Sequence, residues 1–345
     1  MKTVLFCQNP YAFGILKPIM EVLKEKNFSY LWFVRKTIQK QFPFQNEPFT
    51  SDMKEVKEFK SDVIFVPGNE VPYYLRGLKV QIFHGLAGEK KGHFRIRHYF
   101  DLYLTQGPYF TKKFLELKQK FKNFEVLETG WPKLDIYGEE LHKYNVIKKE
   151  LLLKFKAKII VLYAPTFSPS LTSASFLIEE FKELSKNRKY LILIKFHDLM
   201  AVELIEEYKQ LAKSTANIIF EEERNIIKFL LMADIMVSDT SSVVYEFLLL
   251  NKPVITFKSN SKNILWDNSN EYKNLSSKIE SNLKADNFKE KRLKIAQQYH
   301  PYNDGKSALR MVEASLKYIT KNGVPEKRKL SFLRKLKIHK IFGKY

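Results

Sequence analysis

The sequence predicts an α/β protein with two doubly wound domains in tandem, and three observations support this. Short, β-branched apolar runs alternate with longer stretches of helical period along the whole chain, as is typical of βαβ units and parallel sheets. The chain has 345 residues, more than the roughly 250–300 at which a single core stops growing. Polar residues follow the predicted strands, where parallel sheets bind ligands. We therefore expect two domains with a cleft between them.

The first domain is expected over residues 1–145. Its strands are predicted from apolar runs such as TVLFC, and its helices from apolar residues three and four positions apart. The predicted strands span residues 3–7, 30–34, 63–66, 79–83, 101–105 and 125–129. The predicted helices span residues 15–26 and 108–120, and a connecting helix is expected over residues 139–157.

The second domain is expected over residues 146–320, where the same alternation begins again. Its predicted strands span residues 158–163, 190–196, 217–220, 235–238 and 253–257. Its predicted helices span residues 175–186, 200–213, 224–232, 241–250, 287–298 and 305–320. Residues 321–345 remain as a basic tail.

Charge and cysteine content narrow the classes of function. The net charge of +21 indicates an anionic partner, which could be a phosphate-rich substrate, nucleic acid or an acidic membrane surface. The single cysteine, Cys7, excludes an internal disulfide and a Cys-based zinc cluster, and we expect it in the core. No run approaches the roughly 18–20 apolar residues that span a bilayer. The apolar stretch at the start of the sequence is too short and too interrupted by polar residues to be a secretory signal, so we expect a cytoplasmic protein.

The tail over residues 321–345 is strongly basic. It carries nine Lys or Arg residues against one acid, Glu326. Apolar residues alternate with these cations, namely Phe332, Leu333, Leu336, Ile338, Ile341 and Phe342. This pattern predicts an amphipathic helix that lies on the anionic inner face of the cell membrane. The alternative is a solvated chain end.

Two histidines end predicted strands. His84 follows the strand 79–83 and is followed by Gly85, which we expect to let the backbone turn; His197 ends the strand 190–196. A histidine can act as a general acid or base, or as a cation beside a phosphate. The alternative is a histidine satisfied by local hydrogen bonds. The other five histidines lie among polar or basic residues, and we expect them at the surface.

Further candidates suggest a phosphate site. Ser241 and Ser242 open a predicted helix, where backbone N–H groups favour anions, although Ser242 or Asp239 could simply cap that helix. A loop with Lys90, Lys91, Arg95 and Arg97 follows His84, and it forms either an anion-attracting lid or a solvated charge run. Walker and GxGxxG motifs and carboxylate pairs with metal spacing are absent from the sequence, so neither a metal nor a cofactor is expected.

Taken together, these strand ends resemble a known family. The resemblance spans residues 80–310 and rests on a series of short motifs in order: Phe83-His84-Gly85, Thr105-Gln106-Gly107, Thr129-Gly130-Trp131-Pro132, Ala164-Pro165-Thr166, Lys195-Phe196-His197 and Ser238-Asp239-Thr240-Ser241-Ser242. Each motif alone is weak, but the series is similar to that of the CDP-glycerol glycerophosphotransferases, the teichoic-acid primases and polymerases. The sequence departs from the family pattern at Asp198, where proline is usual, and at Thr240, where tyrosine is common.

The resemblance implies a GT-B fold with two Rossmann-like domains. It implies transfer of glycerol phosphate or ribitol phosphate from a CDP-activated donor to a hydroxyl of a lipid-linked or growing cell-surface glycan, with release of CMP and without a metal or cofactor. His84 and His197 match the two histidines that flank the diphosphate; we assign His84 as the base and His197 as charge stabiliser, although the roles could be reversed. The other positions that would bind the donor are Pro165, Thr166, Lys195, Asp239, Thr240, Ser241, Ser242 and Glu246.

Two other classes of function fit part of the pattern. A GT-B nucleotide-sugar glycosyltransferase or a sugar-nucleotide epimerase would share the sheets and the diphosphate site. A non-enzymatic basic protein could bind membrane or RNA through its charge alone. The aromatic residues lie within predicted strands and helices rather than between the basic runs, so we do not expect a nucleic-acid partner.

Overall fold

The computed structural model of the chain describes residues 1–86, 92–223, 225–262 and 264–344 and divides into two compact units. Unit 1 comprises Met1–Glu140 and Gln298–Tyr345, and unit 2 comprises Leu141–Gln297. The first change of unit lies close to the predicted boundary at residue 145. The second does not, because residues 298–320, expected in the second domain, belong to unit 1.

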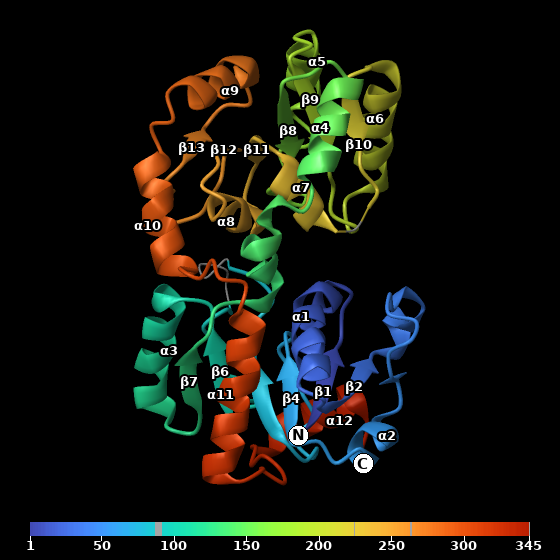
Figure 1. Cartoon of the computed structure of the whole chain (residues 1–345), viewed down its shortest axis with the longest axis vertical. Helices are drawn as coiled ribbons and strands as arrows, with labels where there is room; N and C mark the ends of the chain where they lie inside the picture. The colour runs from blue at the N-terminus through green and yellow to red at the C-terminus, as the bar shows by residue number, and fades with distance from the viewer. Residues whose placement is uncertain (87–91, 224, 263, 345) are drawn as a thin grey trace. The chain divides into compact units, whose positions relative to one another are not determined.

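Unit 1 is built on a seven-stranded sheet in the order β3-β2-β1-β4-β5-β6-β7 (Figure 1). Its strands are β1 (Lys2–Cys7), β2 (Ser29–Val34), β3 (Phe49–Thr50), β4 (Val63–Val66), β5 (Leu78–Gln81), β6 (Leu102–Thr105) and β7 (Glu125–Glu128). All neighbouring strands run parallel. The strand order reverses between β1 and β4, and open parallel sheets bind their ligands at the carboxyl ends beside such a switch point.

The helices of unit 1 come from both ends of the chain. They are α1 (Tyr11–Glu25), α2 (Met53–Glu58), α3 (Pro108–Phe121), α11 (Ser307–Asn322) and α12 (Phe332–Phe342), with 3-10 turns η1 (Lys36–Gln41), η2 (Pro132–Tyr137) and η3 (Glu139–His142), the last at the change of unit.

Asp135 explains why α11 returns to unit 1. Its two carboxylate oxygens accept hydrogen bonds from the backbone N–H groups of Ser307 and Ala308, at 2.8 Å each. These are N–H groups that the first turn of a helix leaves without an internal partner. Asp304 does not cap this helix, as we had expected: its carboxylate accepts from the backbone N–H of Lys306, before the helix begins, and pairs with the guanidinium of Arg310 at 2.6 Å.

The C-terminal helix α12 is part of the core of unit 1. Residues 67–77 connect β4 to β5 without a helix, and on that side of the sheet Ile338 and Phe342 of α12 are buried in one cluster with Phe6 of β1. Figure 1 shows α12 beside β1 and β2. The apolar face predicted for the tail is therefore used largely within the protein.

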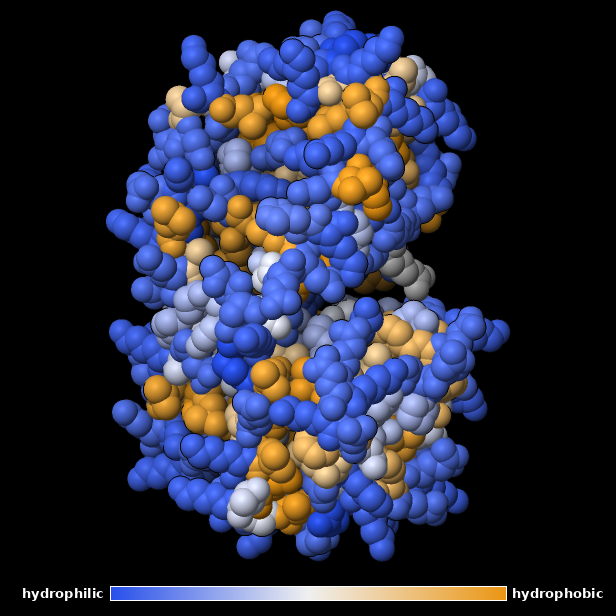
Figure 2. All heavy atoms as spheres, in the orientation of Figure 1, coloured by the Kyte–Doolittle hydropathy of each residue, from blue (hydrophilic) through white to orange (hydrophobic). Residues whose placement is uncertain are grey.

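Only the first turns of α12 keep apolar side chains at the surface. Phe332 is 73% exposed, Leu333 is 76% exposed and Leu336 is 47% exposed. Among the described residues, no helix combines the length and apolar character needed to cross a bilayer. Hydrophilic residues cover most of the face shown in Figure 2.

Unit 2 repeats the arrangement with a six-stranded parallel sheet in the order β10-β9-β8-β11-β12-β13. Its strands are β8 (Ile159–Tyr163), β9 (Tyr190–Ile194), β10 (Ile218–Phe220), β11 (Ile235–Ser238), β12 (Val254–Phe257) and β13 (Asp267–Ser269). Its helices are α4 (Asn145–Lys154), α5 (Ile178–Ser185), α6 (Val202–Ser214), α7 (Ile226–Met232), α8 (Val243–Leu248), α9 (Leu275–Lys284) and α10 (Lys289–Tyr299), the last ending in unit 1. The switch point lies between β8 and β11.

The two parallel sheets confirm the predicted α/β class with two doubly wound units. Every predicted strand has a counterpart, usually within two residues. Cys7 is fully buried on β1, as expected.

Candidate functional site

His84 lies at the carboxyl edge of the unit 1 sheet because of an unusual backbone position before it. The buried Phe83 has a φ of 60°, in the left-handed region that bulky residues rarely adopt. Its ring is held by stacking on His93, with ring centroids 5.2 Å apart. The expected turn at Gly85 is therefore wrong, since Phe83 makes it; a Cβ atom on Gly85 would meet nothing within 4 Å.

The hydrogen bond of His84 defines its tautomer. Its Nδ1 lies 3.1 Å from the carbonyl oxygen of Pro67, the first residue after β4. A carbonyl oxygen can only accept, so Nδ1 carries a proton and the lone pair of the neutral ring is on Nε2. Pro67 follows one of the two strands at the switch point, and the ring of Tyr11, which follows the other, lies 5.2 Å from the imidazole. The basic nitrogen of His84 is therefore Nε2.

His197 has the opposite tautomer. It lies three residues beyond the end of β9, and its Nδ1 accepts a hydrogen bond of 3.1 Å from the backbone N–H of Leu199. An accepting Nδ1 leaves the proton of the neutral ring on Nε2. The ring is exposed and lies 4.5 Å from that of Phe167, which follows β8. His197 therefore presents an N–H donor at Nε2 in its neutral form.

Asp239 joins the ends of β8 and β11 across the switch point of unit 2. Its side chain is almost fully buried. One oxygen accepts from the backbone N–H of Thr166 at 2.8 Å, and the other accepts from the backbone N–H and hydroxyl of Ser173, at 2.8 and 2.9 Å. These bonds give Asp239 a role in shaping residues 166–173, which the sequence did not indicate.

Ser241 and Ser242 are half-buried before α8. Ser242 is the N-cap residue by position, but within the described chain its side chain makes no capping hydrogen bond. The alternative of a simple cap is thus not realised. Because α8 has only six residues, its dipole is short, and a phosphate here needs side-chain donors as well. Thr240 accepts at its hydroxyl from the backbone N–H of Asn260, 3.2 Å away.

The remaining donor-site candidates are buried after β8, after β9 or within α8. Pro165 and Thr166 are buried directly after β8, and Glu246 is buried within α8. Lys195 is also buried, and its Nζ donates to the carbonyl oxygen of Phe196 at 2.6 Å.

The basic loop after His84 is described only in part. Arg95 is exposed, whereas Lys90 and Lys91 lie outside the described residues. Arg97, in the same predicted loop, donates to the carbonyl oxygens of Gly92 and Arg95, each at 3.2 Å.

Two histidines expected at the surface are enclosed by other residues instead, since His300 is buried and His93 is half-buried. His93 packs among the rings of Phe83 and Phe110, and burial lowers its pKa to about 3. His300 accepts a 2.9 Å hydrogen bond at Nε2 from the backbone N–H of Trp131, and burial lowers its pKa to about 4. Both rings are neutral at physiological pH, and their role is structural.

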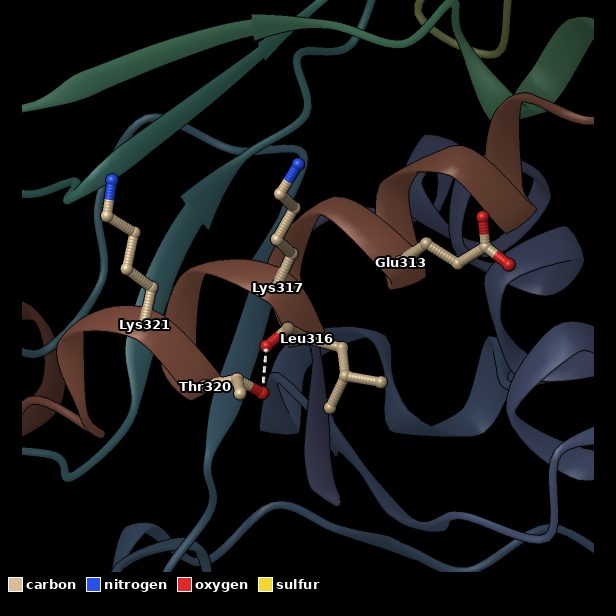
Figure 3. A pocket seen from close by; sticks show the side chains of 5 residues that line it. All are labelled: Glu313, Leu316, Lys317, Thr320 and Lys321. Atoms are coloured by element: carbon tan, nitrogen blue, oxygen red, sulfur yellow. Dashed lines mark hydrogen bonds between the residues drawn. The ribbon is translucent and has the colours of Figure 1, made fainter.

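A concave surface on α11 is lined by none of the predicted site residues. A hollow of about 410 Å³ lies along α11 and is lined by Glu313, Leu316, Lys317, Thr320 and Lys321 (Figure 3). Figure 3 shows Lys317 and Lys321 extending to the same side of the helix, and this surface holds none of the predicted site residues. Among the described residues, no three His, Cys, Asp or Glu side chains are grouped so as to hold a metal ion.

Comparison with known proteins assigns the chain to a family. A model of the CDP-glycerol:poly(glycerophosphate) glycerophosphotransferases matches residues 77–265, more than half of the sequence. A teichoic acid poly(ribitol-phosphate) polymerase of Bacillus spizizenii is 27% identical over 269 residues, 69% of this chain and 41% of that protein. The chain thus spans less than half of that relative's length.

Solved structures show the same fold. The wall teichoic acid polymerase TagF superposes with a TM-score of 0.67 at 17% identity, covering 92% of this chain and 89% of that chain. A putative UDP-N-acetylglucosamine 2-epimerase from Listeria monocytogenes superposes with a TM-score of 0.67 at 14% identity, covering 96% and 99%. The predicted GT-B fold is confirmed, and the chain belongs to the CDP-glycerol:poly(glycerophosphate) glycerophosphotransferase family.

Proposed function

We propose that the chain transfers glycerol phosphate or ribitol phosphate from a CDP-activated donor to a hydroxyl group of a growing teichoic-acid-type glycan, releasing CMP. The observation that carries the proposal is the opposite tautomer of the two strand-end histidines, because the reaction needs one proton acceptor and one hydrogen-bond donor. Family membership supports the reaction class, and a relative named as a poly(ribitol-phosphate) polymerase supports an alditol phosphate as the transferred group.

His84 is the proposed base. Its Nε2 takes the proton of the acceptor hydroxyl while that oxygen attacks the phosphorus atom that bears the alditol. The bond between this phosphorus and the bridging oxygen breaks, and the bridging oxygen leaves as part of CMP. The hydrogen bond between Nδ1 and Pro67 holds the ring in the tautomer that can accept this proton.

His197 is the proposed stabiliser of the leaving group. Phosphoryl transfer depends on positioning and on charge placed at the phosphoryl oxygens. The N–H at Nε2 donates to a diphosphate oxygen, and the bond from Leu199 keeps this proton in place. A ring with this tautomer cannot accept a proton at Nε2, which is why we assign the base to His84.

The rest of the proposed donor site comes from the carboxyl edge of the unit 2 sheet. The hydroxyls of Ser241 and Ser242 donate to the phosphates. Residues near them that complete the site are Pro165, Thr166, Lys195, Thr240 and Glu246. Asp239 acts by positioning residues 166–173. Lys90, Lys91 and Arg95 attract the anionic donor toward His84.

We further propose that the protein works at the inner face of the cell membrane, on a lipid-linked acceptor. The support is the surface of α12, where exposed Phe332, Leu333 and Leu336 alternate with basic residues. Apolar side chains flanked by cations suit an anionic lipid surface.

The test is nucleotide release by purified protein supplied in turn with CDP-glycerol, CDP-ribitol and UDP-sugars. We expect CMP from a CDP-alditol, and a roughly 10²–10⁴-fold loss of kcat in His84→Gln, with the exposed His142→Gln as control. In His84→Gln, the fall of kcat/KM at acidic pH should also disappear. In His197→Gln, kcat/KM should be lower at every pH but should still fall at acidic pH. Release of UDP without CMP would contradict the proposal and favour a nucleotide-sugar enzyme.

A further inference from the structure

Tyr11 lies beside the proposed base in a segment to which no role has been assigned. It is the first residue of α1 and follows β1 at the switch point of the unit 1 sheet. This position is outside residues 77–265, which the family matches. Its ring centroid lies 5.2 Å from that of His84, with an angle of 33° between the planes. The side chain is 45% exposed, unlike the buried apolar residues that α1 packs against the sheet.

The hydroxyl of Tyr11 has a defined direction of hydrogen bonding. The side-chain amide Nδ2 of Asn9 donates to this oxygen at 3.3 Å. The phenol oxygen therefore accepts from Asn9, and the phenol's own proton is not used in this bond. Burial is the main reason that the pKa of Tyr11 is raised, and the nearby Glu70 raises it further. The phenol thus stays a donor at neutral pH.

Glu70, whose charge acts on the pKa of Tyr11, is already engaged. Its carboxylate forms an ion pair of 2.8 Å with Lys337 of α12. Asn9 is engaged with Tyr11 itself. Tyr11 therefore places a phenol O–H donor beside the His84 ring.

We propose that Tyr11 positions the acceptor hydroxyl, its phenol O–H donating to the oxygen that will attack the donor. This inference rests on the proposed transferase function. The attacking oxygen has two lone pairs and one proton. One lone pair accepts from Tyr11, the second is directed at phosphorus, and the proton is aimed at Nε2 of His84. Tyr11 keeps its proton throughout, so it acts on orientation and not as an acid or base.

The experiment compares Tyr11→Phe and Tyr11→Leu in the full chain, with Tyr318→Phe as a matched loss of a phenol hydroxyl from α11. The probes are CDP-glycerol as donor and a soluble synthetic oligo(glycerol phosphate) as acceptor. Tyr11→Phe should lower kcat/KM for the acceptor about 10-fold. The KM for CDP-glycerol should stay unchanged. The slow hydrolysis of CDP-glycerol, measured as CMP release without acceptor, should also stay unchanged.

A second readout separates orientation from simple loss of packing. Tyr11→Phe keeps the ring against His84, so the acidic limb of the pH profile should stay in place. Tyr11→Leu removes the ring and should shift that limb, together with the NMR titration of the His84 imidazole.

The inference is overturned if Tyr11→Phe matches Tyr318→Phe within twofold, or if transfer to acceptor and release to water fall equally. An unshifted His84 titration in Tyr11→Leu would also overturn it, because the ring contact would then be absent in solution. If the wild-type protein releases CMP from neither CDP-glycerol nor CDP-ribitol, the proposed function itself fails. If the wild-type protein turns over normally and Tyr11→Phe is unaffected, only the inference about Tyr11 fails.

Discussion

Two phenylalanines at opposite ends of α12 should respond very differently to replacement by alanine. Phe342 is 9% exposed and Phe332 is 73% exposed, although both lie on one helix of eleven residues. If α12 is a core element of unit 1, Phe342→Ala destabilises that unit. If the first turn of α12 faces lipid, Phe332→Ala weakens membrane binding and leaves stability almost unchanged.

The expected loss for Phe342→Ala follows from its contacts. Its ring lies 5.5 Å from that of Phe6 and 6.5 Å from that of Phe33, centroid to centroid. Removing a buried phenylalanine costs roughly 3–5 kcal/mol of folding free energy. Because Phe342 is the last residue of α12, the chain end can relax, so we expect the lower end, about 3 kcal/mol. For a unit of this size that corresponds to a fall in Tm of roughly 6–12 °C.

The assay is urea unfolding combined with hydrogen exchange of β1 and β2, which reports unit 1 separately from unit 2. Phe342→Ala should speed exchange in both strands, whereas Phe332→Ala should change the free energy of unfolding by less than about 0.5 kcal/mol. Cosedimentation with vesicles containing anionic lipid should show weaker binding for Phe332→Ala. Equal stability of the two variants would refute the burial of α12 in the core. Deleting the whole tail cannot make this distinction, because it removes Phe342 as well as the exposed turn.

Two further predictions concern buried polar groups. Asp239→Asn places an amide N–H₂ among three donors, so we expect about 2–3 kcal/mol lower stability of unit 2 and a raised KM for the CDP-alditol; unchanged thermal unfolding with unchanged KM would count against its positioning role. His300 has a pKa lowered from 6.5 to about 4, so the unfolded chain binds its proton at higher pH than the folded chain does. Stability should therefore be flat above pH 7 and fall as the pH drops from about 6.5 toward 4, with up to about 3 kcal/mol from this group. His300→Gln, whose amide oxygen can still accept from Trp131, should flatten the dependence of Tm on pH, and an unaltered slope would contradict the assignment.

The fold was predictable from the sequence because parallel strands buried on both faces appear as continuous apolar runs. Among the elements that escaped prediction, α9 has ten residues, and the others discussed here are too short to carry a pattern. β3 has two residues and β13 has three, so neither shows an apolar run, and α2 has only six residues. Periodicity identifies an element only when several turns or several residues repeat it.

The return of α11 to unit 1 could not be predicted, although the helix itself was. Residues 305–320 have a clear helical period, but that period does not indicate which sheet the helix packs on. The hydrogen bonds from Ser307 and Ala308 to Asp135 span 172 and 173 positions of sequence. For the amphipathic tail, too, the pattern predicts an apolar face but does not indicate which residues or which surface cover that face.

Histidine environments were predicted well where the strand-end rule applied and at His142, which is exposed as expected. His84 and His197 lie at the edges where they were expected, while the expected exposure of His93 and His300 was wrong. Their sequence neighbours are polar or basic, but their spatial neighbours include Phe83 and Trp131, which come from other segments. Tyr11 was missed for a different reason. It too follows a predicted strand, so the strand-end rule extended to residues 8–11 would have found it.

The roles proposed for His84 and His197 are assigned from backbone atoms rather than from side-chain type. Both histidines follow parallel strands, so the sequence left their roles interchangeable. A carbonyl oxygen at Pro67 and a backbone N–H at Leu199 give the two imidazoles opposite proton positions. The partner of Nδ1 thereby decides whether Nε2 can take a proton or can donate a hydrogen bond. The proposed reaction removes a proton from one oxygen and stabilises charge on another, so it would need one ring of each kind, which is the arrangement that these two backbone contacts favour.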